Sequence, residues 1–252
     1  MKILVCVKQV PDTDAPISID SGGQWTGQAL PFRMNRFDEY ALEEALLIKE
    51  AHPGISIDAV SVGPERAQTV VRRAMELGAD AGVHIEICAE GYVPPEVVAV
   101  HLKEYAQDKA YDLILCGAMS EDCMHGQVGS LLAEMLGLPS ITAVIAAHMR
   151  EDGYGLDIEQ ETEGGLRRRF EMAMPAVMSV QSGINHPRYP TLTNVLRAKR
   201  QSIGHIMARD VPSQTRFSFR PAPEAKQGVM ITGSLHEQAR QMLRLLHEHA
   251  IL

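Results

Sequence analysis

Short apolar runs alternate with amphipathic segments through residues 2–137 of the chain. Continuous apolar runs are typical of strands buried on both faces of a parallel sheet, and such strands are predicted at 2–8, 55–62, 83–87 and 112–116. Helical spacing predicts a helix that begins near Asn35 and Asp38, and further helices at 65–77, 96–107 and 128–136. This alternation predicts right-handed crossovers and an α/β fold with a doubly wound, mostly parallel sheet.

The pattern changes after residue 140, where strand-like runs follow one another without helices between them. These runs lie at 141–148, 156–161, 167–172 and 176–180, and the residues Glu163-Gly164-Gly165 predict a hairpin turn. We expect these strands to extend the sheet antiparallel at one edge. Residues 203–227 show little periodicity and are predicted to form an extended arm, which an amphipathic helix at 235–249 follows.

Composition and charge narrow the class of protein. The chain has 252 residues and a formal charge of −8, which argues against nucleic acid or an anionic membrane as the main partner. No segment approaches the run of about 18 apolar residues that a membrane-spanning helix needs. The N-terminal run lacks a signal-peptide cleavage pattern, so we expect a cytoplasmic protein without membrane insertion.

The sequence offers no recognisable catalytic machinery. The cysteines Cys6, Cys88, Cys116 and Cys123 lack CxxC spacing and are predicted to be reduced core thiols rather than metal ligands. His247-Glu248-His249 is interpreted as the solvated face of the terminal helix. Because no Ser/His/Asp or Cys/His arrangement can be placed, no catalytic residue and no metal ligand are predicted.

One loop carries the polar groups from which a function can be inferred. It runs from Gly117, at the end of a predicted strand, to Val128, at the start of a helix. Open parallel sheets bind ligands beyond the carboxyl ends of their strands, and a helix N-terminus offers N–H groups to a phosphate. If the first and fourth predicted strands are neighbours, their ends meet at this loop. The pattern predicts a nucleotide site, and the alternative is an ordinary strand-to-helix loop.

Six stretches, in this order, resemble the β subunit of electron transfer flavoproteins along nearly the whole chain. They are "MKILVCVKQVPD", "MNRFDEYALEEALLIKE", "VSVGPERAQTVVRRAMELGAD", "DLILCGAMSEDCMHGQVG", "PAVMSVQSGINHPRYPTLTNVLRAK" and "GVMITGSLHEQARQML". The resemblance implies an αβ heterodimer whose α subunit holds most of a redox-active FAD. It also implies a structural AMP in this subunit, and electron transfer from a flavin dehydrogenase to a downstream acceptor. The chain is then an electron-carrier subunit rather than an independent enzyme.

The resemblance assigns the AMP contacts residue by residue. They are Cys6, Asn35, Arg36, Phe37, Asp38, Val62, Gly117, Ala118, Met119, Ser120, Glu121, Asp122, Cys123, Met124, His125, Gly126, Gln127 and Val128. These positions include the strand ends that the topological argument favours. The loop lacks a basic group that would help neutralise a pyrophosphate, and Phe37 is the one aromatic residue among these positions. AMP is therefore predicted rather than FAD.

A second motif, "NHPRYPTLTNVLRAKR" at 185–200, resembles the loop through which this family contacts its partner dehydrogenase. The matching apolar anchor is Leu192, which Tyr189 precedes, and a short helix with Arg197 and Lys199 follows it. One apolar anchor with a basic rim suits a small, quickly dissociating contact with an acidic partner. The alternative is that Leu192 packs its own helix against the domain.

The resemblance divides the chain into an adenine-nucleotide-binding domain at 1–184, a recognition segment at 185–202, and a C-terminal arm and helix at 203–252 that contact the α subunit. The loop departs from the commonest family pattern at Ala118 and at Asp122-Cys123-Met124. In these features it resembles the branch that serves amine dehydrogenases. Two other functions remain open: a bifurcating flavoprotein with a second redox-active FAD in this subunit, and a stand-alone nucleotide sensor of the universal-stress type.

Overall fold

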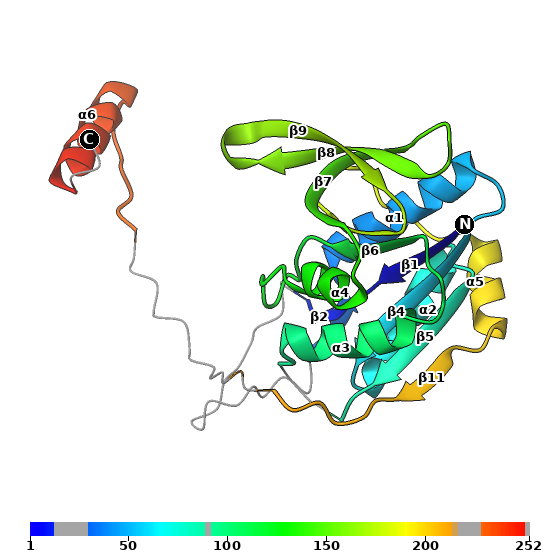
Figure 1. Ribbon diagram of the computed structural model, residues 1–252. Coiled ribbons are helices and arrows are strands. Elements are labelled where there is room, and N and C mark those ends of the chain that lie inside the picture. The colour runs from blue at the N-terminus through cyan, green and yellow to red at the C-terminus, as the bar shows by residue number, and fades with distance from the viewer. Residues whose placement is uncertain (13–29, 89–91, 214, 216–227, 250–252) are drawn as a thin grey trace.

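The computed structural model describes residues 1–12, 30–88, 92–213, 215 and 228–249. The centre of the described fold is a nine-stranded sheet between layers of helices (Figure 1). The strand order is β11-β5-β4-β1-β6-β10-β7-β8-β9. The strands are β1 (Lys2–Cys6), β4 (Ser56–Gly63), β5 (Ala81–Glu86), β6 (Leu113–Gly117), β7 (Ser140–Met149), β8 (Gly155–Thr162), β9 (Leu166–Ala173), β10 (Ala176–Val180) and β11 (Gly204–Met207).

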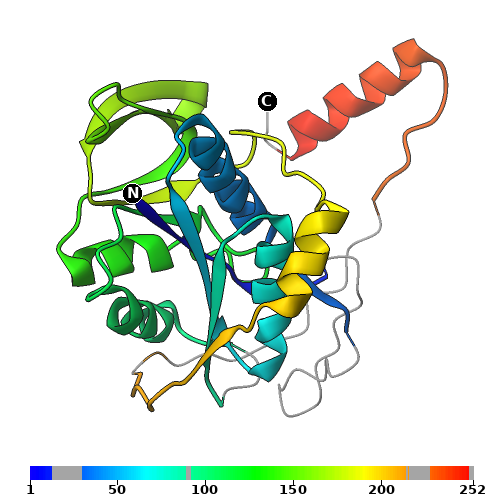
Figure 2. The ribbon, with the colours of Figure 1, turned by 90° about the vertical axis from the view of Figure 1, so that its right-hand side faces the viewer.

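Helices cover both faces of the parallel part of this sheet, whereas β8 and β9 extend beyond them (Figure 2). The described helices are α1 (Arg36–Ala51), the short η1 (Glu65–Ala67), α2 (Gln68–Leu77), α3 (Pro95–Ala106), α4 (Val128–Leu136), α5 (Leu192–Arg200) and α6 (Leu235–Glu248). Successive strand residues point to opposite faces, so Ile3 and Val5 pack with α1 and α2. Leu4 and Cys6 pack with α3 and α4 on the other face. Both faces of β1 are therefore core, as its continuous apolar run predicts.

The doubly wound, mostly parallel α/β sheet is confirmed, together with the helices predicted from the sequence. The predicted helix at 65–77 corresponds to η1 and α2, and the one at 128–136 corresponds to α4. Each ends at a glycine with positive φ: 141° at Gly78 and 66° at Gly137. Residues with a side chain rarely adopt such a φ, so the glycines end both helices.

The strands after residue 140 differ in part from the prediction. β8 and β9 extend the edge antiparallel, as expected, and the turn η2 (Glu163–Gly165) joins them. The prediction is wrong for β10, which lies between β6 and β7 and runs parallel to both. All residues of β10 are buried, as in a strand that helices cover on both faces. β7 pairs parallel with β10 and antiparallel with β8, so it joins the two kinds of pairing.

The sequence does not predict three short strands. β2 (Gln9–Pro11) and β3 (Phe32–Met34) form an antiparallel pair. β11 pairs parallel with β5, within the segment predicted to be an extended arm. These strands have three or four residues, which is too short for a hydrophobic period to stand out. The part of the predicted arm at 216–227 lies outside the described residues.

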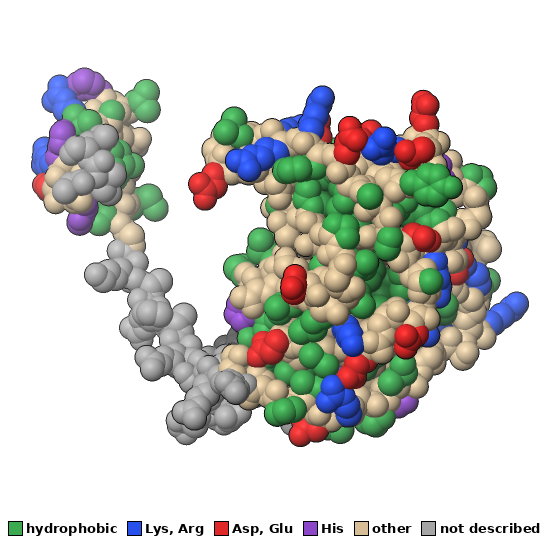
Figure 3. Space-filling view, viewed as in Figure 1, with side chains coloured by type: hydrophobic (Ala, Val, Ile, Leu, Met, Phe, Trp, Pro, Cys, Tyr) green, Lys and Arg blue, Asp and Glu red, His purple; other side chains and the backbone are tan. Residues whose placement is uncertain are grey.

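The C-terminal helix α6 stands apart from the sheet in both ribbon views (Figures 1 and 2). A capping box of Ser234 and Glu237 begins this helix, which the amphipathic pattern predicts at 235–249. None of its described residues is buried, and Met242 and Leu243 are exposed on it. Hydrophobic side chains are visible on the surface of this helix in Figure 3. Among the described residues, no helix combines the length and hydrophobicity that crossing a membrane requires.

Candidate functional site

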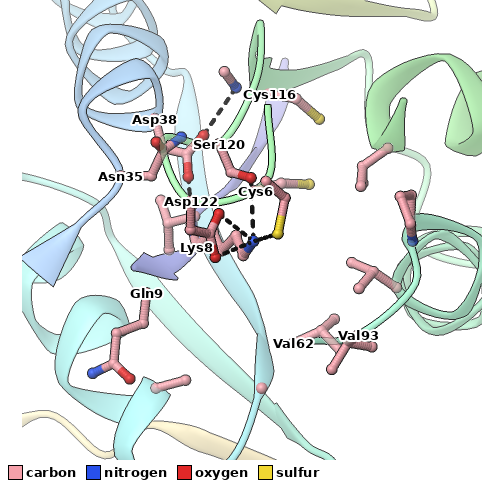
Figure 4. A pocket seen from close by; sticks show the side chains of 18 of the residues that line it. Cys6, Lys8, Gln9, Asn35, Asp38, Val62, Val93, Cys116, Ser120 and Asp122 are labelled. Atoms are coloured by element: carbon pink, nitrogen blue, oxygen red, sulfur yellow. Dashed lines mark hydrogen bonds and ion pairs between the residues drawn. The ribbon is translucent and has the colours of Figure 1, made fainter. Parts of the chain in front are cut away.

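A cavity of about 420 Å³ lies at the carboxyl ends of β1, β4 and β6 (Figure 4). β1 pairs with both β4 and β6, which confirms that the first and fourth predicted strands are neighbours. The chain proceeds from β1 through β4 to β5 and then crosses to β6, on the other side of β1. Strand order therefore reverses at the cavity, which is where open α/β sheets bind their ligands.

Most of the predicted nucleotide contacts line this cavity. They are Cys6, Asn35, Asp38, Val62, Gly117, Met119, Ser120, Asp122, Cys123, His125, Gly126, Gln127 and Val128. The predicted contacts Arg36, Phe37, Ala118, Glu121 and Met124 are not among the lining residues. The fold thus brings the strand ends and the loop at 117–128 together around one space, and five of the predicted residues do not line it.

Asn35 ties the start of α1 to this loop. It occupies the N-cap position of α1, but its side chain caps no helix N–H group. Its Nδ2 instead donates to the carbonyl of Met119 at 2.9 Å, and its Oδ1 accepts from the N–H of Glu121 at 3.1 Å. The Glu121 carboxylate in turn accepts from the guanidinium of Arg33 and from the N–H of Arg36. These contacts fix the shape of the loop.

Asp38 joins three elements beside the cavity. Its carboxylate accepts from the N–H of Lys8 at 2.7 Å and from the N–H of Gly117 at 3.1 Å. Burial raises the pKa of Asp38 from 3.8 to about 7, although both N–H donors act against this rise. At Gly117, a Cβ atom would lie only 2.6 Å from the Cβ of Phe37, so glycine permits the close approach of β6 to α1.

The raised pKa of Asp38 predicts a dependence of stability on pH. The folded chain retains this proton up to about pH 7, whereas the unfolded chain loses it near 3.8. The free energy of unfolding is therefore expected to fall as pH rises between these values, by at most about 1.4 kcal/mol per pH unit. Asp38→Asn, which cannot titrate, should flatten this slope in urea denaturation between about pH 4.5 and pH 7. Equal slopes in both proteins would mean that another group carries the dependence.

Lys8 is a cavity residue that the sequence does not single out. It follows β1, and its ammonium donates to both carboxylate oxygens of Asp122, at 2.7 and 2.8 Å, and to Ser120 Oγ at 3.2 Å (Figure 4). Burial acts to raise the pKa of Asp122, but the charge and hydrogen bonds of Lys8 outweigh it and lower that pKa. A basic group absent from the loop is thus supplied by the segment that follows β1. Its position directly after a buried strand is the signal that could have identified it.

The start of α4 forms another part of the cavity wall. The first N–H groups of a helix have no partner within it, and the side chain of the N-cap residue Gln127 caps none of them. Gly126 has a φ of 62°, and a Cβ atom there would lie 3.0 Å from the carbonyl oxygen of Ala118. An anion in the cavity could therefore accept from backbone N–H groups, at the positive end of the α4 dipole.

The cysteines divide into two groups. Cys6 and Cys116 are buried at the ends of neighbouring strands. The hydrogen bond between their thiols is the main cause that raises the pKa of Cys6, and burial is the second cause. Cys123 is half-buried in the loop, and Cys88 is exposed. All of them are free thiols, so the prediction of reduced thiols stands. The prediction of a core position is wrong for Cys88, which lies beyond the end of β5, and for Cys123, which lies in the loop.

Comparison with known proteins shows the family of the chain. A family model described as "Electron transfer flavoprotein domain" matches residues 27–210. The electron transfer flavoprotein subunit beta of Bacillus subtilis is 32% identical over 266 aligned residues, which cover 99% of each chain. The chain belongs to the electron transfer flavoprotein β-subunit family. The resemblance carried by the six sequence stretches is thereby confirmed.

Other members of this family are similar to the chain to nearly the same degree. The proteins of the same printed name from Methylophilus methylotrophus and Bos taurus are 30% and 36% identical. The first alignment covers 98% of each chain, and the second covers 84% of this chain and 83% of the bovine one. The family relationship therefore extends over both the α/β domain and the segments that follow it.

The segment that resembles the recognition loop of the family lies at the surface beside α2. Leu192, the first residue of α5, has 74% of its surface exposed, and Tyr189 has 89% exposed. Leu192 therefore does not pack α5 against the domain. Arg197 instead holds α5 to the domain, because its guanidinium donates to two backbone carbonyls at the end of α2, those of Met75 and Ala79. Lys199 is exposed on the same helix.

Proposed function

We propose that the chain carries electrons as the β subunit of a heterodimer, in which the α subunit holds most of the FAD. Electrons pass from a flavin dehydrogenase to a downstream acceptor through that FAD. The observation that carries the proposal is the cavity at the strand-order reversal, lined by most of the residues that family resemblance assigns to a nucleotide. Since none of those residues needs to react, the chain acts by binding and positioning.

The nucleotide proposed for this cavity is AMP. The cavity volume, about 420 Å³, is near the lower end of the range of about 300–1,000 Å³ found for ligand pockets, which suits a mononucleotide better than FAD. One phosphate could be neutralised by Lys8 and by the N–H groups at the start of α4. Val62 and Val93 present apolar groups that suit an adenine ring (Figure 4). The residues of this chain hold the nucleotide and keep it from water, and it takes no part in redox chemistry.

The α subunit is proposed to cover α6. This helix carries exposed Leu235, Met242 and Leu243, which the described part of the chain does not bury. An amphipathic helix with an uncovered apolar face is typical of a segment that packs on a partner. We accordingly divide the chain into a nucleotide-binding domain at 1–184, a recognition segment at 185–202, and an arm and helix at 203–252 for the α subunit.

Co-expression with candidate α subunits tests this function. The expected product is a stable yellow complex of two chains, because the chain by itself lacks most of the flavin site. Deleting residues 228–252 should weaken the complex while the α/β domain remains folded, as circular dichroism would show. A colourless monomer without affinity for any α-type chain would contradict the proposal and favour the stand-alone sensor.

Leu192→Ala is expected to weaken binding of the partner dehydrogenase by about thirtyfold, since truncating an anchor residue costs about 2 kcal/mol. The melting temperature should hardly change, because 74% of the Leu192 surface is already exposed. Electron-transfer rates measured against dehydrogenase concentration would show the effect. Leu166→Ala is a matched control, since Leu166 is 68% exposed on β9 and lies outside the recognition segment. Similar losses in both variants would rule out a specific anchor at Leu192.

An amine dehydrogenase is the proposed electron donor. The support is the loop pattern, in which Ala118 and Asp122-Cys123-Met124 resemble the branch of the family that serves such enzymes. The similar proteins named above share one printed name and do not distinguish the branches. Reduction of the purified complex by an amine dehydrogenase, and not by an acyl-CoA dehydrogenase, is the expected result. The opposite preference would refute this assignment and leave the family unaffected.

A further inference from the structure

His84, Glu86 and His205 meet on one face of the sheet, at the edge that β5 and β11 form. His84 and His205 are register partners in the parallel ladder, and Glu86 follows His84 by two residues. The strand period of two therefore puts all three side chains on the same face. One potential ligand atom from each residue lies within 4.8 Å of the others. Two imidazoles and a carboxylate are a donor set that Zn²⁺ uses in proteins.

The buried member of this cluster has the hydrogen bond that a metal ligand needs. His84 is only 1% exposed, and its Nε2 lies 3.0 Å from the carbonyl oxygen of Gly63. A carbonyl can only accept, so Nε2 carries a proton, and Nδ1 is the ring atom left to bind an ion. Metal-binding histidines usually donate their other N–H group in this way, which fixes both tautomer and ring orientation.

The other two members leave the cluster open to solvent. Nε2 of His205 lies 2.6 Å from the carboxylate of Glu86, and their side chains are 46% and 24% exposed. The rings of His84 and His205 have their centroids 5.8 Å apart, at an angle of 49°. An ion arriving from solvent would replace the hydrogen bond between His205 and Glu86, and water can occupy the remaining coordination position.

Beside His84 lies a buried hydroxyl group that has no hydrogen-bond partner among the described residues. Ser61 of β4 is the register partner of His84, so it lies next to His84 on the same face. It is 1% exposed, and its Oγ has no hydrogen-bond partner within the described part of the chain. Buried hydroxyl groups are ordinarily hydrogen-bonded. A water ligand of a bound ion would supply the missing partner.

We propose that His84, Glu86 and His205 bind one divalent transition-metal ion of the zinc class, with water as a further ligand. Two ligands belong to β5 and one to β11, so the ion fastens β11 to the sheet. β11 begins the C-terminal arm that leads to α6, and the ion therefore anchors the start of that arm. Gly63, whose carbonyl oxygen lies 3.0 Å from His84 Nε2, is also a lining residue of the nucleotide cavity, so the two sites are adjacent.

Titration of the full chain with Zn²⁺ after chelator treatment tests this site. The full chain is used with any α subunit that co-purifies. Calorimetry is expected to show one Zn²⁺ per chain, and Zn²⁺ should raise the melting temperature. His205→Ala and Glu86→Gln should each weaken Zn²⁺ binding by at least about tenfold, because losing even an outer partner of a ligand costs that much. Both residues are solvent-accessible, so the variants should fold, which circular dichroism would verify.

The control variant is His148→Ala, which removes an exposed histidine from β7 and should bind Zn²⁺ like the original chain. A second source of binding is His247 and His249, which are exposed on and beside the end of α6. Binding that survives His205→Ala and disappears in His249→Ala would overturn the proposal. It would also be overturned if the chelated chain bound no Zn²⁺. Neither result would affect the proposed electron-carrier function.

Discussion

Gly126→Val is expected to empty the nucleotide cavity and to lower the melting temperature by about 10 °C. A left-handed φ of 62° strains a β-branched residue by about 1–3 kcal/mol. The new side chain also crowds the carbonyl oxygen of Ala118, 3.0 Å from the Cβ position, at the wall where the phosphate is proposed to bind. Loss of a ligand present at 100 times its Kd removes a further 2.7 kcal/mol or so, about as much as the strain. Nucleotide content and thermal unfolding measure the two effects.

Gly137→Val separates strain from nucleotide loss. Gly137 has a φ of 66°, close to that of Gly126, and no atom lies within 4 Å of its Cβ position. It ends α4 at the opposite end of the helix from the cavity, so this variant should lose stability by strain alone and retain its nucleotide. If both variants kept their nucleotide and lost equal stability, the loop at 117–128 would not be the phosphate site.

Lys8→Met is expected to weaken nucleotide binding by about 10- to 150-fold, the equivalent of one charge-assisted hydrogen bond of about 1.5–3 kcal/mol. The substitution removes the cation of the segment after β1 and leaves the carboxylate of Asp122 without its ion pair. Methionine is unbranched and only one heavy atom shorter than lysine, so packing beside the strand end should change little. Calorimetric titration of AMP into nucleotide-free protein would measure the loss.

Lys109→Met is the matched control for Lys8→Met, because Lys109 is exposed and lies over the ring of Tyr105, outside the cavity. It should leave AMP affinity unchanged. Equal affinities in the Lys8 variant and the original chain would exclude Lys8 from phosphate binding. The ammonium would then serve only to hold Asp122 and Ser120 in the loop.

The position of the cavity could be predicted from the sequence because it follows from local patterns. Apolar runs fix where β1, β4 and β6 end, and right-handed crossovers bring those ends to one side of the sheet. The interior position of β10 could not be predicted in this way. Its apolar run suits an edge strand packed on the core as well as an interior one, and only the pairing with β6 and β7 decides between them.

Side-chain partners within the site were harder to predict, since they join residues far apart in the chain. Lys8 binds Asp122, and the ring of His84 lies beside that of His205, although more than a hundred residues of sequence separate the members of each pair. Asn35 was correctly placed at a helix start, yet its side chain serves the loop rather than the helix. Helix-start patterns predict where a residue lies, whereas its hydrogen bonds depend on which segment the fold brings beside it.

The nucleotide content of the purified complex tests the central claim most directly. The complex with its α subunit is denatured by heat, and the released nucleotides are separated and quantified against protein. The account predicts one AMP and one FAD per heterodimer, with the AMP reduced in Gly126→Val and retained in Gly137→Val. Two FAD per heterodimer and no AMP would contradict it, and would show that this cavity belongs to a bifurcating flavoprotein.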